Sequence, residues 1–153
     1  MDPLQEQCQA PADRTGAGLR CGALTEQIIG VFYDVYNELG HGFLESVYER
    51  SMEIALRDAG LLVLAQQPLP VLFRGHQVGD FRADLIVEQQ VIVELKSARA
   101  LEPAHEAQVL NYLRATRIEV GLLLNFGPRP TIKRFTFDNP RKETRAVGPL
   151  RPA

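Results

Sequence analysis

The chain has 153 residues, of which 45% are hydrophobic and 24% are charged, and its formal net charge is −2. These values are typical of a single globular domain, and they argue against a repeat array, a disordered chain or a protein that coats nucleic acid by bulk positive charge. The longest apolar run, at 120–124, is far shorter than the roughly 20 residues of a transmembrane helix, so we expect no membrane span.

Charge is distributed unevenly along the chain. Residues 1–113 hold 8 Lys and Arg against 16 Asp and Glu, whereas residues 114–153 hold 9 against 3. A basic C-terminal quarter can steer a polyanion toward an acidic site elsewhere in the fold. A solvated basic face and tail is the alternative interpretation of the charge alone.

The first 23 residues show little periodicity and lack the basic and apolar segments of an export signal. We therefore expect residues 1–23 to form a disordered leader of a cytoplasmic protein. Cys8 and Cys21 have a spacing that fits no zinc or redox signature, so we expect reduced thiols, with a regulatory disulfide as the alternative.

Two helices are predicted at the start of the domain. Thr25 is the expected N-cap of the first, because apolar residues then recur at helical spacing until Gly40 ends the run. A second amphipathic run begins at Leu44, and Gly60 is the expected residue after its last turn.

Strands and one further helix complete the predicted domain. Period-two alternation with β-branched residues predicts strands at 61–66, 70–74, 78–87 and 91–97. Pro103 begins a helix that ends near Thr116. Two more strands are expected at about 119–125 and 131–137. The order α-α-β-β-β-β-α-β-β predicts a layered α/β or α+β domain over residues 24–138, followed by a basic polar tail at 139–153.

The most informative stretch is the hairpin predicted around residues 88–90. If its turn is centred on Gln89, Asp84 lies directly opposite Glu94, with the two Cβ atoms roughly 5 Å apart. Side chains alternate along a strand, so Lys96 points to the same face as Glu94. The sequence therefore predicts two carboxylates and an ammonium at one place.

Two carboxylates this close repel each other and require a cation. Lys96 supplies part of the positive charge. Mg²⁺ can supply the rest, because it takes one or two carboxylates and completes its shell with waters and phosphate oxygens. The alternative is an ion-pair cluster of Asp84, Glu94 and Lys96 on a solvated sheet face.

Two helical features favour a site over a simple ion-pair cluster. Glu45 lies in the first turn of the second helix, one position from its apolar stripe, and can project along the protein. Gln108 and Tyr112 are four residues apart and share a helix face with His105. Taken singly, Glu45 also fits a surface residue favoured by the helix dipole, Tyr112 a core residue, and His105 a satisfied or exposed histidine.

Five elements occur in order along the chain: Gly42-x-x-Glu45-x-x-Tyr48, Asp84, Glu94-Leu95-Lys96, Gln108-x-x-x-Tyr112 and the run 121–127. In this order they resemble the bacterial GxxExxY protein family of the PD-(D/E)XK nuclease superfamily, over about residues 25–137. Members of that family tend to have Val-His where this chain has Val35-Tyr36. Any role of that histidine is therefore absent here or passes to His41.

The resemblance implies a restriction-endonuclease-like core, which is a mixed β-sheet flanked by helices. It implies that Asp84 and Glu94 bind a metal ion, Mg²⁺ or Mn²⁺, and that Glu45, the acidic residue contributed by a helix, helps to hold it through a water or a second ion. Lys96 is then the catalytic lysine, and Gln108 with Tyr112 forms a helix motif also found in RecB-like nucleases. The expected activity is hydrolysis of phosphodiester bonds in nucleic acid, with DNA as the favoured substrate.

Two other functions remain open at this point. One is a catalytically silent interaction or regulatory module that keeps the nuclease fold, because a fold does not fix a function. The other is binding of a metal without hydrolysis. A chain of this size offers little surface to embrace a duplex, so a homodimer or a protein partner is also expected.

Overall fold

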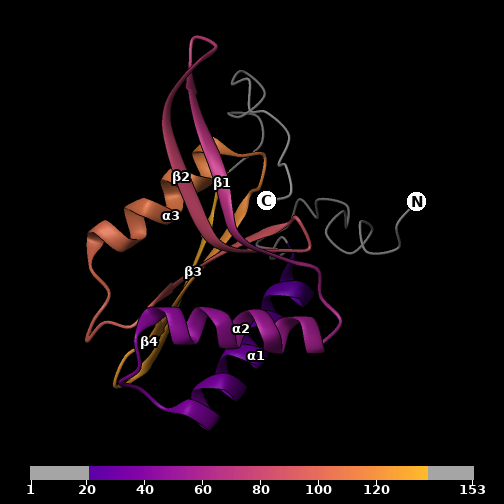
Figure 1. Ribbon diagram of the computed structural model, residues 1–153, viewed down its shortest axis with the longest axis vertical. Coiled ribbons are helices and arrows are strands. Elements are labelled where there is room, and N and C mark those ends of the chain that lie inside the picture. The colour runs from indigo at the N-terminus through magenta and orange to yellow at the C-terminus, as the bar shows by residue number, and fades with distance from the viewer. Residues whose placement is uncertain (1–20, 138–153) are drawn as a thin grey trace, which may run out of the picture.

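The computed structural model describes residues 21–137, which form three helices and five strands (Figure 1). The helices are α1 (Gly22–Leu39), α2 (Glu45–Asp58) and α3 (Pro103–Ala115). The strands are β1 (Val63–Phe73), β2 (His76–Val87), β3 (Val91–Lys96), β4 (Val120–Phe126) and β5 (Pro130–Thr136). The predicted tail, and all but the last three residues of the predicted leader, lie outside the described residues.

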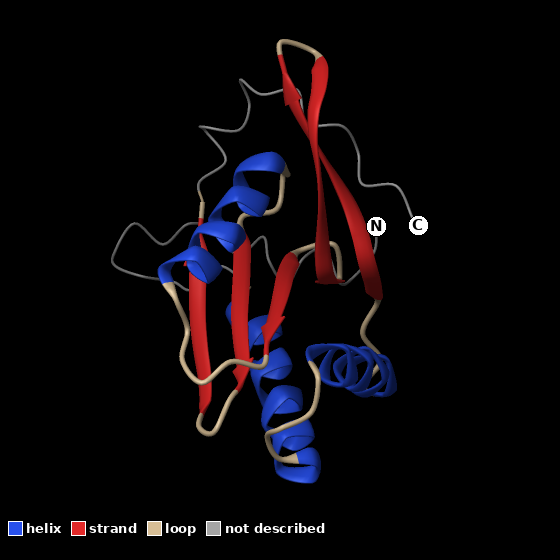
Figure 2. Cartoon of the chain, turned by 60° about the vertical axis from the view of Figure 1, so that its left-hand side comes forward, coloured by secondary structure: helices blue, strands red, loops and turns tan. Residues whose placement is uncertain are grey.

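The strands form a single sheet in the order β1-β2-β3-β4-β5. β3 and β4 are parallel, and the other neighbouring strands are antiparallel. A parallel pair needs a long crossover, and α3 supplies it between β3 and β4. The predicted mixed α/β sheet flanked by helices is therefore confirmed (Figure 2).

Both faces of the central strands are buried, and each face has its own core. On one face α1 and α2 cover alternate residues of β3, namely Val91, Val93 and Leu95. On the other face α3 covers Ile92 together with Ile86 of β2. The sequence of a central strand that is buried on both faces is a nearly continuous run of apolar residues. A carboxylate in such a strand is therefore unusual.

The prediction of two separate strands at 61–66 and 70–74 is wrong, because β1 is one continuous strand. Pro68 and Pro70 were expected to separate them. Within residues 21–137, β1 is an edge strand whose one neighbour is β2. The missing N–H groups of both prolines are tolerated on an edge strand, where they also hinder pairing with another chain. The β1–β2 hairpin extends well beyond the other three strands (Figures 1 and 2).

Three local predictions concern the first helices. The expected N-cap at Thr25 is wrong, because α1 already begins at Gly22 and the Thr25 hydroxyl donates to the Gly22 carbonyl at 3.0 Å. The expected helix ends are confirmed, since Gly40 and Gly60 both have positive φ, at 67° and 85°. No helix within residues 21–137 is long and apolar enough to cross a membrane.

The expectation of a reduced thiol at Cys21 is wrong, because Cys21 is disulfide-bonded. Its partner lies outside the described residues. The spacing of two cysteines can exclude a zinc or redox signature, but it does not exclude a disulfide bond.

Candidate active site

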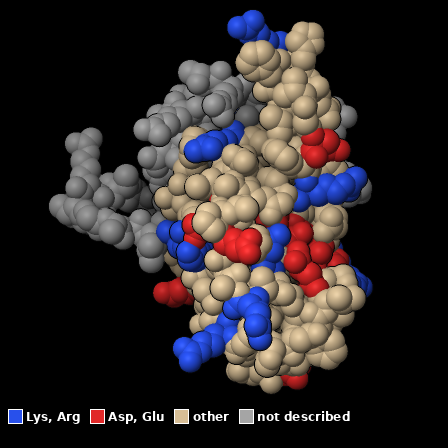
Figure 3. Space-filling model, turned by 90° about the vertical axis from the view of Figure 1, so that its left-hand side faces the viewer, with Lys and Arg blue, Asp and Glu red and all other residues tan. Residues whose placement is uncertain are grey.

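Acidic side chains gather in the middle of one face of the molecule, with Lys and Arg side chains beside them (Figure 3). The open end of the β2–β3 hairpin carries Asp84 and Glu94. The hairpin has the predicted register, with Leu85 opposite Val93, Ile86 opposite Ile92 and Val87 opposite Val91.

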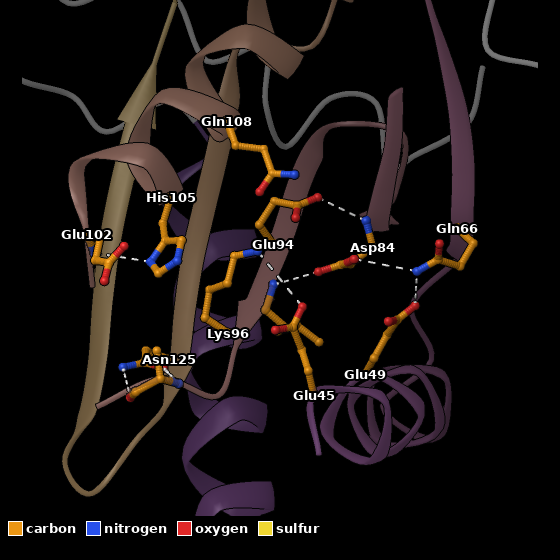
Figure 4. A network of polar contacts seen from close by, with 12 residues as sticks. Glu45, Glu49, Gln66, Asp84, Glu94, Lys96, Glu102, His105, Gln108 and Asn125 are labelled. Carbon is orange, nitrogen blue, oxygen red and sulfur yellow. Dashed lines mark hydrogen bonds and ion pairs between the residues drawn. The ribbon is translucent and has the colours of Figure 1, made fainter. Parts of the chain in front are cut away.

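At Asp84 and Glu94, bonds from backbone N–H groups to side-chain carboxylates replace the backbone–backbone hydrogen bonds of the sheet. The Asp84 N–H donates to Glu94 Oε1 at 3.0 Å, and the Leu95 N–H donates to Asp84 Oδ2 at 2.9 Å (Figure 4). Each carboxylate is therefore fixed by a backbone N–H of the opposite strand. The two acidic groups are held together by the fold despite their mutual repulsion.

Glu94 has the most strongly perturbed environment in the site. Only 1% of the residue is exposed. Burial and the nearby charge of Asp84 raise the pKa of Glu94 to about 9, although Lys96 and the Asp84 N–H act in the opposite direction. Without a cation Glu94 therefore holds a proton at neutral pH, and a cation next to the pair would displace it.

Lys96 lies between this pair and the start of α2. Its Nζ is 3.9 Å from Glu45 Oε1, and its side chain is 17% exposed. Glu45 is the first residue of α2 and lies half-buried. Burial raises the pKa of Glu45, while the charge of Lys96 opposes this rise. Glu45 thus contacts the predicted catalytic lysine.

α3 approaches the acidic pair from above the sheet. Gln108 Nε2 donates to the Tyr112 hydroxyl at 2.8 Å, and Gln108 points from the helix toward Glu94 (Figure 4). The Tyr112 ring belongs to the α3 core, and only 3% of the residue is exposed. Burial and the charge of Glu94 raise the pKa of Tyr112 to about 12, so its hydroxyl stays protonated. Tyr112 is both a core residue and a neighbour of the site.

His105 has a structural task at the start of the same helix. Its Nδ1 accepts the backbone N–H of Glu102 at 3.1 Å, which completes a capping box at the N-terminus of α3. It is near enough to Glu45 to lower the pKa of that carboxyl. The main interaction of His105 is therefore this hydrogen bond, which agrees with the interpretation of His105 as a satisfied histidine.

Two site residues were not predicted from the sequence, Glu49 and Gln66. Gln66 Nε2 donates to Glu49 Oε1 and to Asp84 Oδ1, the latter at 3.5 Å. Burial raises the pKa of Glu49, and the bond from Gln66 lowers it. The spacing of four residues from Glu45 was a signal for Glu49, since such residues share a helix face. For Gln66, a polar residue on an irregular strand, the sequence offered no signal.

The Gly42…Tyr48 motif holds the loop that precedes Glu45. The buried Tyr48 donates its hydroxyl to the Gly40 carbonyl at 2.6 Å and accepts the Phe43 N–H at 3.2 Å. Gly42 has a φ of 111°, which side chains other than hydrogen rarely allow. The Ser97 hydroxyl donates to the Phe43 carbonyl at 2.9 Å. The motif therefore connects the start of α2 to the residue after Lys96.

The run 121–127 fixes the same loop after Lys96 from strand β4. The buried Asn125 side chain accepts the Ala98 N–H and donates to the Ala98 carbonyl, both at 2.9 Å. A Cβ at Gly127 would clash with that same carbonyl oxygen. Tyr36, the first of the two positions considered above for a histidine, donates its hydroxyl to the Gly127 carbonyl at 2.8 Å. His41, the other position considered, is exposed.

The donor set suits an oxygen-loving cation that is shared with a substrate. Within residues 21–137, no three Asp, Glu, His or Cys side chains group closely enough to enclose an ion, so Glu45, Asp84 and Glu94 do not form a closed cage. Asp84 and Glu94 provide two adjacent carboxyl groups, and Glu94 is too buried and too close to Asp84 to ionise readily without a cation. Mg²⁺ binds in this manner, through one or two carboxylates, waters and substrate phosphates. The residues present therefore fit a divalent ion of this kind.

Comparisons with known proteins identify the fold and the superfamily of the chain. No curated protein matches the chain. A solved structure, titled "Crystal structure of SSO0001", has a similar fold, with a TM-score of 0.50 and 16% sequence identity. The match covers 74% of this chain but 59% of that one, so the chain spans little more than half the length of its structural neighbour. The model of the PD-(D/E)XK nuclease superfamily matches residues 22–135, and the chain therefore belongs to that superfamily.

Proposed function

We propose that this chain is a bacterial nuclease of the GxxExxY type that hydrolyses phosphodiester bonds of DNA in the cytoplasm with Mg²⁺ or Mn²⁺. One observation supports the proposal above all others. Asp84 and Glu94 are held side by side, with the pKa of Glu94 raised to about 9, and Lys96 lies on the same face of the sheet. Holding two carboxyl groups this close costs free energy when no cation is bound. Groups whose pKa is perturbed in this way are typical of functional sites.

Asp84 and Glu94 are the residues that would hold the ion. When bound, a divalent cation supplies Lewis-acid polarisation of a phosphate oxygen and favours ionisation of water. Glu94 gives up its proton as it takes on this role. Both carboxylates keep acceptor capacity beyond their backbone bonds, because each ionised carboxylate has about four lone-pair sites.

Lys96 acts on the substrate side of the site. Glu45 lies 3.9 Å from its Nζ and limits the positions that the ammonium can take. From there Lys96 donates to the attacking water and stabilises negative charge that develops on the phosphoryl group. Its side chain is only 17% exposed, so this interaction is less screened than one in bulk water.

Gln108 and Tyr112 support these groups from α3. Gln108 Nε2 donates one N–H to the Tyr112 hydroxyl, which fixes the carboxamide, and its oxygen would then orient Lys96. Basic residues in the C-terminal quarter, such as Arg129, would contribute phosphate contacts without reading bases. A homodimer or a protein partner completes the proposal, and light scattering of the purified chain tests for the dimer.

A cleavage assay tests the function directly. Labelled single-stranded DNA, duplex DNA and RNA are incubated with Mn²⁺ or Mg²⁺, and with EDTA as the metal-free reference. We expect cutting by the wild type and a severe loss of cutting by Asp84→Ala and Lys96→Ala. Asp80→Ala is the matched control, because Asp80 is an exposed carboxylate on the same strand. Absence of cutting by a folded wild type that still binds the ion would favour a catalytically silent module.

A further inference from the structure

We propose that Gln66 is a positioning residue that connects the Asp84 carboxylate to the α2 carboxylate Glu49 and thereby orients Asp84 for binding of a divalent cation. The inference rests on the proposed function and deepens it, because it assigns a task to a residue of the edge strand β1. Gln66 itself needs no contact with the ion or with the scissile phosphate. It acts through the groups to which it donates hydrogen bonds.

The position of Gln66 in the sheet supports this role. Ala65 pairs with Leu85 and Gln67 with Ala83, so Gln66 lies opposite Asp84. The pair Gln66–Asp84 is missing from the ladder, and Gln66 has a φ of 51°. β1 is therefore distorted at the one residue that faces Asp84. A left-handed conformation is uncommon for glutamine, and such conformations cluster at functional sites.

The hydrogen bonds of Gln66 indicate what the distortion achieves. Its side-chain amide donates to both Glu49 and Asp84, and the Arg82 guanidinium donates to its backbone carbonyl at 3.3 Å. The amide thus connects helix α2 with strand β2. Asp84 receives one bond on each oxygen, from Leu95 on Oδ2 and from Gln66 on Oδ1, so its carboxylate plane is fixed.

The chemistry of an amide suits this position better than that of a charged residue. A glutamine amide offers two N–H donors and no net charge. It can therefore lie between two carboxylates and orient both without neutralising them. A lysine or arginine here would compete with the cation for the same oxygens. Partners that orient a metal-binding group typically change metal affinity by about 10- to 100-fold when they are lost.

A glycine substitution separates this role from a purely structural one. Gln66→Gly removes the amide and at the same time relieves the left-handed backbone, because glycine adopts positive φ readily. We expect the thermal midpoint in EDTA to stay equal or rise, while the affinity for Mn²⁺ measured by calorimetry falls by about tenfold or more. Gln89→Gly is the matched control, because Gln89 is an exposed glutamine with a φ of 55° in the β2–β3 turn.

The possible results distinguish this inference from the proposed function. Unchanged Mn²⁺ affinity in Gln66→Gly would overturn the inference, whether or not the wild type cleaves DNA. So would an equal loss of affinity in Gln89→Gly. If the wild type binds Mn²⁺ without cleaving any substrate, the proposed function fails, and a selective loss of affinity in Gln66→Gly would still support the inference. A wild type that binds neither Mn²⁺ nor Mg²⁺ would overturn both.

Discussion

The two ends of the β2–β3 hairpin use the same pair of strands in opposite ways. Near the turn, Ile86 and Ile92 face each other in a regular ladder, and both are fully buried. Two residues further along the same face, Asp84 and Glu94 replace the ladder with side-chain bonds to backbone N–H groups. One end stabilises the fold, and the other keeps two repelling carboxylates in place.

Helix α3 packs against both the apolar end and the acidic end of this sheet face. Its apolar residues Val109 and Leu113 pack in the core that contains the isoleucine pair. Its polar groups, the Gln108 amide and the Tyr112 hydroxyl, lie at the acidic end. The dense apolar end therefore supplies the stability and the register that the polar end needs. Four substitutions test this division.

The largest effect is expected at the polar end from Lys96→Ala. Loss of the ammonium should reduce turnover by about 10²- to 10³-fold, since it removes a group that stabilises charge only as the reaction proceeds. Mn²⁺ affinity should change far less, because Lys96 is not among the residues that hold the ion. Single-turnover cleavage and calorimetry measure the two quantities. Equal activity of variant and wild type would contradict the role given to Lys96.

A smaller effect, a gain in stability, is expected from Glu94→Gln. The folded protein holds a proton on Glu94 up to a pKa of about 9, whereas the unfolded chain releases it near 4.5. Stability in EDTA therefore falls as the pH rises through this window, and a glutamine, which has no such proton, escapes that loss. At the alkaline end the variant should melt at least about 3 °C above the wild type, the shift that about 1 kcal/mol gives in a domain of this size.

Thermal melts across this pH range compare the two proteins. Parallel curves at all pH values would show that the Asp84–Glu94 pair does not destabilise the fold. The control is cleavage activity, which Glu94→Gln should lose although it is the more stable protein.

At the apolar end, a substitution should lower the stability and leave the turnover unchanged. Ile92→Val removes one methylene from a fully buried side chain and should lower the free energy of unfolding by about 0.5–1.5 kcal/mol. Urea denaturation measures the loss. Turnover per folded molecule should stay at the wild-type value, and a clear fall would mean that the two ends are coupled more tightly than the contacts indicate.

The smallest effect is expected from Tyr112→Phe. The ring keeps its packing against Phe81, at a centroid distance of 5.4 Å, and only the bond from Gln108 is lost. We expect a loss of stability of roughly 0.5 kcal/mol, at the low end for one hydrogen bond, because Gln108 can then bond to water. A fall in turnover of more than about tenfold, or 1.4 kcal/mol, would instead assign the Tyr112 hydroxyl a direct part in the reaction.

The sequence by itself determined the central part of the candidate site. The turn at residues 88–90 and the alternation of side chains on β2 and β3 predicted that Asp84 faces Glu94 and that Lys96 shares their face. The prediction succeeded because hairpin register depends on neighbouring residues, and a one-residue slip would expose the whole apolar face. The same local logic predicted the start of α3 at Pro103 and the end of α2 before Gly60.

Only the tertiary structure decided the contacts between segments that lie far apart in the chain. It made β1 one strand through two prolines, because the strand lies at the sheet edge. It also brought Gln66 to Glu49 and Asp84, and Asn125 to Ala98. Each of these contacts depends on how helices and strands pack against each other rather than on a periodicity along the chain. A hairpin can be predicted from its own residues, whereas the groups that orient its carboxylates become visible only once the layers are assembled.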